Sequence, residues 1–277
     1  MDKLEAHKYT ILIVSSLLIF EYHPFRRIKH YVTSRTYLKE VDKTSQVVFD
    51  LGLFVFQVFI LSELMKFISS INSKIVVISA PLRQHLTIDI SPLLPSNSVV
   101  VFLITAFLFL NAWDFFQYWS HRLMHLSLFW EKMHKFHHGT KMYALTSFRH
   151  HPFESIFLNF TITVPTSTIY AFAFPAGDFF IFWLLASIQS LALHSDLSFP
   201  KIPFLSTFFL TPNHHALHHD IGRLRTCNFG QYFTIWDRLF GTYVCPYQLS
   251  SQRIVTGKNH SIKKNFQQLF YSPKGIA

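Results

Sequence analysis

Histidine is the residue type through which this sequence offers most chemistry. The chain contains 17 histidines, and 12 of them lie between residues 121 and 219. Residues three or four apart lie on one face of a helix, so closely spaced histidines can present several imidazoles to one point. Imidazole binds zinc, copper and iron, which predicts a centre of two metals. The predicted ligands are His121, His125, His134, His137, His138, His194, His215, His218 and His219.

Six further residues near these histidines could orient the ligand rings through the ring N–H that faces away from a metal. They are Asp114, His151, Glu154, Asp196, His214 and Asp220. Asp114 precedes His121 by seven residues on nearly the same helical stripe, although a helix-end charge or a partner for Arg122 is the alternative. His151 precedes Pro152, where the chain must bend, so a capping role is the alternative there.

The composition indicates a membrane protein. Half of the residues are hydrophobic, 32 are phenylalanine and only 14% are charged, whereas soluble domains carry roughly 25% charged residues. Cys227 and Cys245 are too few for a disulfide framework and lack the spacing of a structural zinc site. The net charge of +10 does not predict nucleic-acid binding, because the basic residues lie in the connections between apolar runs, as at a cytoplasmic membrane surface.

The apolar runs predict an all-α fold, a multi-pass transmembrane helical bundle of about four to five spans. They cover residues 9–22, 47–71, 99–128, 153–174 and 179–193. The first run is shorter than the ~20 residues that a span requires. The basic connection 24–43 is expected on the cytoplasmic side. The connection 72–97 contains three prolines and is expected to be irregular and to lie on the opposite side.

The parity of these spans places the predicted ligands together in a cytoplasmic helical cap. His121 lies ~33 Å along its helix from Val99, about the thickness of the hydrocarbon core. A turn at residues 175–178 brings His194 back to the same side. Short helices are expected at 131–138, capped by Gly139, and after Thr211, which is a favourable N-cap before proline. Gly222 is expected to end the last of these helices.

Several motifs together resemble the fatty acid hydroxylase/sterol desaturase superfamily of membrane histidine-box enzymes. Residues 114–125 are similar to its first histidine box, 130–138 to its second and 211–219 to its last. Arg149, His151, Pro152 and Glu154 are similar to a short element between the boxes, and residues 228–230 and 236–242 to the segment after the last box. The resemblance covers roughly residues 114–243. It divides the chain into an N-terminal membrane region (1–97), a fatty acid hydroxylase-like catalytic region (98–245) and a cytoplasmic tail (246–277).

This resemblance implies a non-haem di-iron centre that uses O2 to hydroxylate or desaturate a lipid, sterol or fatty-acyl chain. Because no flavin or dinucleotide motif is visible, electrons must come from a ferredoxin, a b-type cytochrome or a reductase. Zinc outcompetes ferrous iron at imidazole sites, so purified protein could carry zinc. One departure concerns Ser190, since relatives often place His or Asn four positions before the equivalent of His194.

Two other functions compete with an oxygenase. A metal-dependent membrane hydrolase is disfavoured because the sequence contains no HExxH motif, which would supply a glutamate base beside the ligands. A metal transporter would require ligands near the middle of the membrane, whereas these histidines are predicted at one interface.

Overall fold

The computed structural model describes residues 43–86, 98–140, 142–173, 179–195, 200–220, 226–248 and 262–270. These residues form helices and no strand, apart from an isolated bridge between Phe209 and Phe233. The all-α class is therefore confirmed for the described part of the chain. The expected run at 9–22, the basic connection 24–43 except for Lys43, and the turn 175–178 lie outside it.

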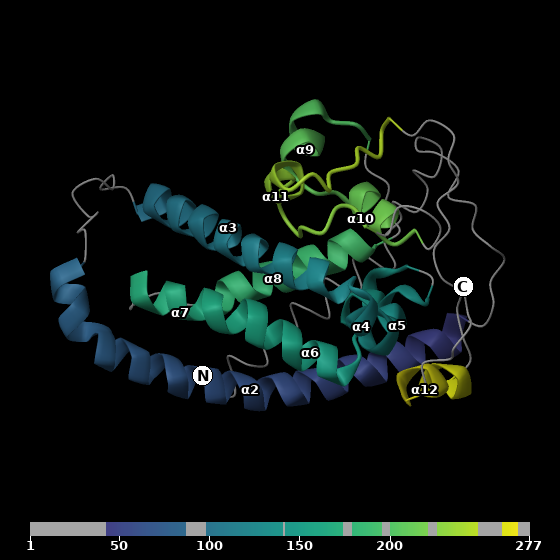
Figure 1. Ribbon diagram of the computed structural model, residues 1–277, viewed down its shortest axis with the longest axis horizontal. Coiled ribbons are helices and arrows are strands. Elements are labelled where there is room, and N and C mark those ends of the chain that lie inside the picture. The colour runs from purple at the N-terminus through teal and green to yellow at the C-terminus, as the bar shows by residue number, and fades with distance from the viewer. Residues whose placement is uncertain are drawn as a thin grey trace.

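Long helices form a bundle whose members lie side by side, and several of the short helices gather at one end of it (Figure 1). The long elements are α2 (Lys43–Leu86), α3 (Ser98–Met124), α8 (Phe179–His194), and the continuous run of α6 (Pro152–Leu158), a π-helical turn (Asn159–Thr163) and α7 (Val164–Ala173). The short elements include α4 (Ser127–Phe129), a π-helical turn (Trp130–His134), α5 (Lys135–His138), a 3-10 helix (Ala144–Phe148), α9 (Pro203–Phe208), α10 (Pro212–His218), α11 (Ile235–Leu239) and α12 (Ile262–Phe270).

One helix among the described residues is long and apolar enough to cross a membrane. The most apolar 18-residue window of this segment, Val99–Met124, has a mean hydropathy of 2.1, and only 17% of that window is buried. A core helix of a soluble protein would be mostly buried, so the exposed apolar surface of α3 is what distinguishes it. The expected count of four to five spans stays a prediction, because this finding concerns one helix.

Two helix boundaries differ from the sequence-based expectation. α2 continues through Pro81 to Leu86, although an irregular connection was expected from residue 72. Pro81 removes a single backbone hydrogen bond near the end of a helix that already has about ten turns, which limits its effect. α3 ends at Met124, earlier than expected, because Leu126 N donates to Leu123 O (3.0 Å) and the chain turns at His125.

The short helices largely follow the expected signals. α5 ends at Gly139, where an added Cβ would lie 3.0 Å from the carbonyl oxygen of Lys135, so the close approach favours glycine although its φ is −70°. Thr211 is the N-cap of α10, as expected. That helix ends at His218, four residues before Gly222, which lies outside the described residues.

A buried polar network ties α2 to the segment between α5 and α6. Arg149 Nη1 donates to Asp50 Oδ1 over 2.7 Å, and both side chains are fully buried. Tyr143 donates its hydroxyl to the same carboxylate, and Gln46 Nε2 donates to it over 2.9 Å. Arg149 Nε also donates to Phe136 O over 3.1 Å. Through Phe136 and Arg149, this network fixes the backbone within the second histidine motif (130–138) and the backbone that follows it.

Candidate metal centre

The nine predicted ligands form two adjacent clusters. The five-histidine cluster contains His121, His125, His134, His138 and His218. The four-histidine cluster contains His137, His194, His215 and His219. Within each cluster, one nitrogen per residue lies within 4.8 Å of every other. The structure therefore brings together all nine residues in an arrangement able to hold two metal ions, and their role as ligands stays a prediction.

The second and the last histidine motif each contribute residues to both clusters. In the second motif, His134 and His138 are four apart and enter the five-histidine cluster, while His137 points to the other one. The last motif does the reverse. His215 and His219 share the four-histidine cluster, and His218 joins the five-histidine cluster. Residues three and four apart both lie near one helix face, but they are ~100° from each other around the axis. Each motif can therefore contribute to both clusters.

Burial keeps these imidazoles neutral. Desolvation lowers the pKa of His134 to about 3. Desolvation, followed by the influence of neighbouring imidazoles, lowers the pKa of His137, His138 and His219 well below the usual value. A neutral imidazole keeps one ring nitrogen free of a proton, and that nitrogen is the one that binds a metal.

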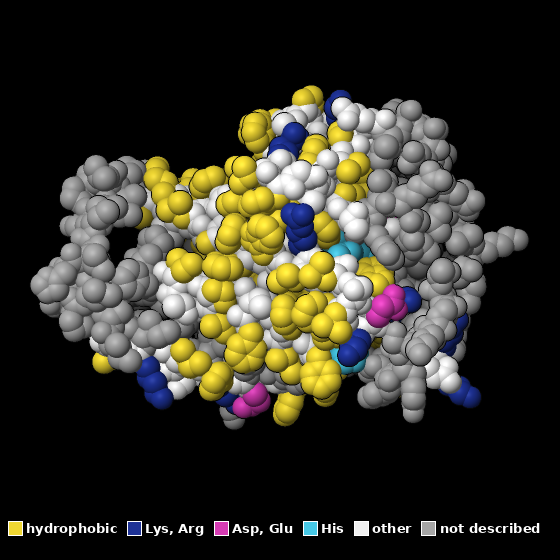
Figure 2. Space-filling view, viewed as in Figure 1, with side chains coloured by type: hydrophobic (Ala, Val, Ile, Leu, Met, Phe, Trp, Pro, Cys, Tyr) yellow, Lys and Arg dark blue, Asp and Glu magenta, His cyan; other side chains and the backbone are white. Residues whose placement is uncertain are grey.

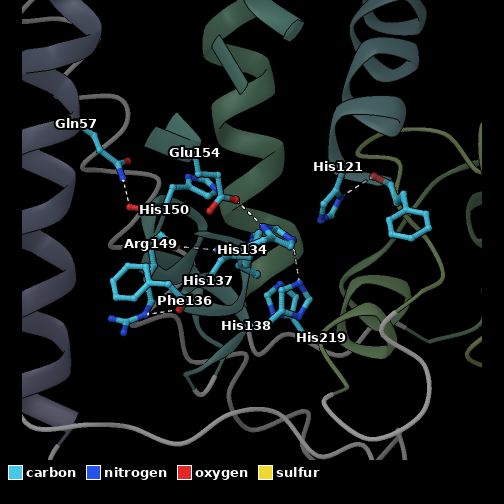
Figure 3. A network of polar contacts seen from close by, with 12 residues as sticks. Gln57, His121, His134, Phe136, His137, His138, Arg149, His150, Glu154 and His219 are labelled. Carbon is cyan, nitrogen blue, oxygen red and sulfur yellow. Dashed lines mark hydrogen bonds and ion pairs between the residues drawn. The ribbon is translucent and has the colours of Figure 1, made fainter. Parts of the chain in front are cut away.

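Oxygen acceptors fix the outer nitrogen of five rings, and Figure 3 shows part of this arrangement. A carbonyl or carboxylate oxygen accepts a hydrogen bond, so Nδ1 of these rings is the donor and Nε2 carries the free lone pair. The contacts are His121 to Phe229 O (2.9 Å), His134 to Glu154 Oε1 (2.6 Å), His137 to Arg149 O (3.2 Å), His194 to Ser190 O (2.8 Å) and His218 to Cys227 O (2.8 Å).

The inner nitrogens fit metal ions. Nε2 of His194 lies 3.1 Å from Nε2 of His137 and 3.0 Å from Nε2 of His215. The Nδ1 protons of His137 and His194 are already donated outward, so their Nε2 lone pairs face each other and repel. Both ring nitrogens of His125 and Nε2 of His218 are buried without any hydrogen bond. A cation between such nitrogens would satisfy them, since buried polar groups otherwise require partners.

Among the residues expected to support the ligands, Glu154 contacts a predicted ligand directly, because its carboxylate oxygen accepts a hydrogen bond from His134. Asp114 does not contact a histidine or Arg122. Its carboxylate accepts hydrogen bonds from the backbone N–H groups of Gln231 (2.5 Å), Tyr232 (3.0 Å) and Phe233 (2.8 Å). A loop from far along the chain thus packs against this face of α3, and its backbone N–H groups, which would otherwise be buried without partners, pair with the Asp114 carboxylate.

The remaining three described candidates lie outside both clusters. His151 caps α6, where it accepts from Phe153 N over 3.3 Å. His214 accepts from Thr211 N over 3.2 Å and lies 3.3 Å from Tyr243 OH, so it fixes the start of α10. Asp220 is buried just after α10. Asp196 lies outside the described residues.

Asp237 was not singled out as a site residue by the sequence, yet it shapes the site. It is fully buried and accepts from Phe229 N (2.8 Å) and Gly230 N (3.0 Å). Asp114 and Asp237 thus hold successive parts of the 229–233 segment, and the Phe229 carbonyl of this segment accepts a hydrogen bond from His121. The sequence signal that could have identified Asp237 is an acidic residue within an otherwise largely apolar stretch.

A cavity of about 170 Å³ adjoins both clusters. His137, His194 and His215 of the four-histidine cluster line it, as do His121 and His134 of the five-histidine cluster. The cavity continues between α3, the π-helical turn after α6, and α8, where apolar side chains alternate with uncharged polar ones such as Gln117 and Asn159. This arrangement suits a largely apolar molecule with one part held beside the histidines.

Two further cavity residues, His150 and Ser190, flank the four-histidine cluster. The His150 ring stacks on His137 with centroids 4.9 Å apart, and desolvation lowers its pKa to about 4. Gln57 of α2 donates to the His150 carbonyl over 3.2 Å (Figure 3). Ser190 contributes its backbone carbonyl to His194 and lines the cavity.

Comparison with known proteins agrees with this site. Residues 106–242 match the family described as fatty acid hydroxylase. The chain is 36% identical over 146 residues to human lathosterol oxidase, covering 52% of this chain and 45% of that protein. It is 30% identical over 185 residues to methylsterol monooxygenase 1-3 of Arabidopsis thaliana (65% and 61% covered). It is 33% identical over 152 residues to sphinganine C4-monooxygenase 2 of the same plant (54% and 56% covered).

Residues 106–242, about half of the chain, therefore form a region of the fatty acid hydroxylase family. The matched region begins within α3 and includes all nine clustered histidines. The chain spans about half the length of the curated relatives that it matches. No solved structure matches it significantly.

Proposed function

We propose that this protein is a membrane-bound non-haem di-iron oxygenase that uses O2 and external electrons to hydroxylate or desaturate a lipid, sterol or fatty-acyl chain. The observation that carries the proposal is the pair of adjacent, buried, all-histidine clusters beside a mostly apolar cavity. The names of the relatives, which include an oxidase and two monooxygenases, support the same reaction class.

The two clusters would each hold one iron ion, and the pair would supply the redox chemistry by which O2 is reduced and a C–H bond is oxidised. The residues of this chain orient and insulate that pair. Five rings donate a hydrogen bond that fixes their orientation. The acceptors are the backbone carbonyls of Phe229, Arg149, Ser190 and Cys227 and the carboxylate of Glu154. Burial of the rings excludes bulk water from the ligand nitrogens.

The membrane placement is part of the proposal. α3, the α6–α7 run and α8 would cross the bilayer, with the histidines at their cytoplasmic end. The exposed apolar surface of α3 supports this placement. The electron donor would be a separate ferredoxin, b-type cytochrome or reductase that approaches the cytoplasmic end. A hydrolase is not favoured, because the sequence lacks HExxH and Glu131 is an exposed partner of Lys135.

The test is lipid mass spectrometry of cells that express the protein under 18O2, compared with cells that express His137→Ala. We expect a lipid that gains one 18O atom or loses two hydrogens in the first culture only. His151→Ala is the matched control, because His151 caps a helix outside both clusters. If no lipid changes, or if His137→Ala gives the same products, the oxygenase proposal is wrong.

A further inference from the structure

Helices α9 and α11 carry a concentration of exposed apolar side chains. Phe204 of α9 and Leu239 of α11 are each 66% exposed, and Phe208 is 55% exposed. The full set of exposed apolar residues on this part of the chain is Ile202, Phe204, Leu205, Phe208, Phe209, Ile235 and Leu239. A contiguous apolar surface of this kind marks contact with a membrane or another protein.

The two helices form one element, which we define as residues 202–210 and 232–240. Thr234 N donates to Phe208 O over 3.0 Å, and Leu210 N donates to Tyr232 O over 2.8 Å. Thr234 Oγ1 donates to Thr207 O over 2.5 Å. These bonds fix α9 against α11, so the apolar side chains of both belong to a single surface.

This α9–α11 element packs along the side of α3 and not beyond its end. The Phe233 ring lies 5.7 Å from Phe107, and the Trp236 ring lies 5.0 Å from Phe115. Phe107 precedes His121 by 14 residues, which is ~21 Å along a helix axis. In Figure 2 hydrophobic side chains continue from the α9–α11 region onto the neighbouring α3. If α3 crosses the bilayer, the element therefore lies at the depth of the hydrocarbon.

The polar groups of the element are compatible with hydrocarbon. Asp237 is fully buried, and its carboxylate accepts from backbone N–H groups. Arg238 is exposed, but its guanidinium donates to Thr207 O over 3.3 Å and lies 3.8 Å from the centre of the Tyr243 ring. Its charge is thus directed toward the protein. Backbone groups within hydrocarbon must be satisfied internally, and the bonds between α9 and α11 do this.

We propose that the α9–α11 element is re-entrant, entering the bilayer from the histidine side, contacting lipid acyl chains and returning to the same side. Helices of six and five residues are only ~9 Å long or less, so neither can cross the ~30 Å core. The inference rests on the membrane placement of α3 proposed above. It adds a membrane-embedded element to the expected topology, between His194 and the tail expected at the cytoplasmic side.

Site-directed spin labelling of the full-length protein in phosphatidylcholine bilayers tests this inference. Labels are attached to Phe204→Cys and Leu239→Cys in a Cys245→Ser background, since Cys227 is buried. Leu103→Cys on the exposed face of α3 is the lipid-facing reference, and Lys263→Cys on α12 is the water-facing reference. The measurement is the ratio of collision rates with O2, which concentrates in hydrocarbon, and with a water-soluble nickel chelate.

We expect the ratios at positions 204 and 239 to equal that at 103 and to exceed that at 263. Ratios at 204 and 239 that equal the one at 263, while 103 is lipid-facing, overturn the inference and leave the proposed function standing. Low collision rates with both reagents, together with dipolar broadening between labels, would show that a second copy covers the surface, which also overturns it. A water-facing result at 103 itself would instead overturn the membrane placement of the proposed function, and the inference with it.

Discussion

The two histidine clusters are built from the same residue type but are supported differently. In the five-histidine cluster, one ring proton goes to the buried carboxylate of Glu154. In the four-histidine cluster, the supporting acceptors are the carbonyls of Arg149 and Ser190. A carboxylate partner increases ligand basicity more than a neutral carbonyl does. We therefore expect the five-histidine cluster to bind its metal more tightly.

The clusters also differ in their access to the cavity. Three of the four histidines in the smaller cluster line it, against two of five in the larger one. Metal sites that act in catalysis retain open positions, whereas sites with complete protein ligation are structural. Under the proposed function, we expect a division in which the smaller cluster faces the lipid and O2 and the larger one holds the pair of metals in place.

The largest expected effect is a difference in metal content between two matched variants, one in each cluster. His138 and His219 are both buried, and their rings stack with centroids 4.2 Å apart, although they belong to different clusters. His219→Ala leaves three ligands, and we expect purified protein to hold one metal per chain. His138→Ala leaves four, enough for tetrahedral binding, and we expect it to retain two. Elemental analysis checks this. Equal losses in both variants would contradict the division.

The next effect concerns the carboxylate. Glu154→Gln removes the charge beside His134, and we expect the affinity of the five-histidine cluster for metal to fall by roughly 10- to 100-fold. Competition with a chelator measures the two affinities separately. Glu131→Gln is the control, because Glu131 is exposed and pairs with Lys135. If Glu154→Gln lowers only the affinity for the more weakly bound metal, the five-histidine cluster is not the tighter site and our interpretation is wrong.

A smaller effect is expected from the segment that holds His121. Asp237→Asn weakens hydrogen bonds to Phe229 N and Gly230 N, and bonds to a charged acceptor contribute about 2 kcal/mol each. We expect a lower free energy of unfolding and a weaker five-histidine cluster. Unfolding in detergent, followed by circular dichroism, measures the first. Glu63→Gln removes a charge from an exposed pair with Lys66, and unchanged stability is expected there.

The smallest effect is expected at Ser190. Its backbone carbonyl contacts His194, so Ser190→Ala keeps that contact. We expect both metals to remain, with a change in stability within about 0.5 kcal/mol. Elemental analysis and thermal unfolding measure these quantities. Loss of the more weakly bound metal in this variant would show that the serine hydroxyl, directly or through water, contributes to the four-histidine cluster.

Local spacing predicted much of the site, because helical periodicity determines which neighbours share a face. It could not predict that His137 and His218 cross to the opposite cluster from their neighbours, since this depends on how the motifs face each other. The partners of Asp114 begin 117 residues away, at Gln231, and no local pattern specifies them. The continuation of α2 through Pro81 is likewise not predictable from local sequence, because proline usually ends a helix and only the long helix before it offsets that preference.

The Asp50–Arg149 ion pair has a consequence for biosynthesis. The two residues are 99 positions apart, and they join α2 to a segment of the family-matched region, across the boundary expected at residues 97 and 98. At translation rates of about 5–20 residues per second, the Asp50 carboxylate waits ~5–20 s for its partner. A chain that lacks α2 would leave Arg149 as an uncompensated buried charge, which costs about 3–5 kcal/mol. The region that carries the histidines is therefore expected to be less stable when it is produced without the earlier helix.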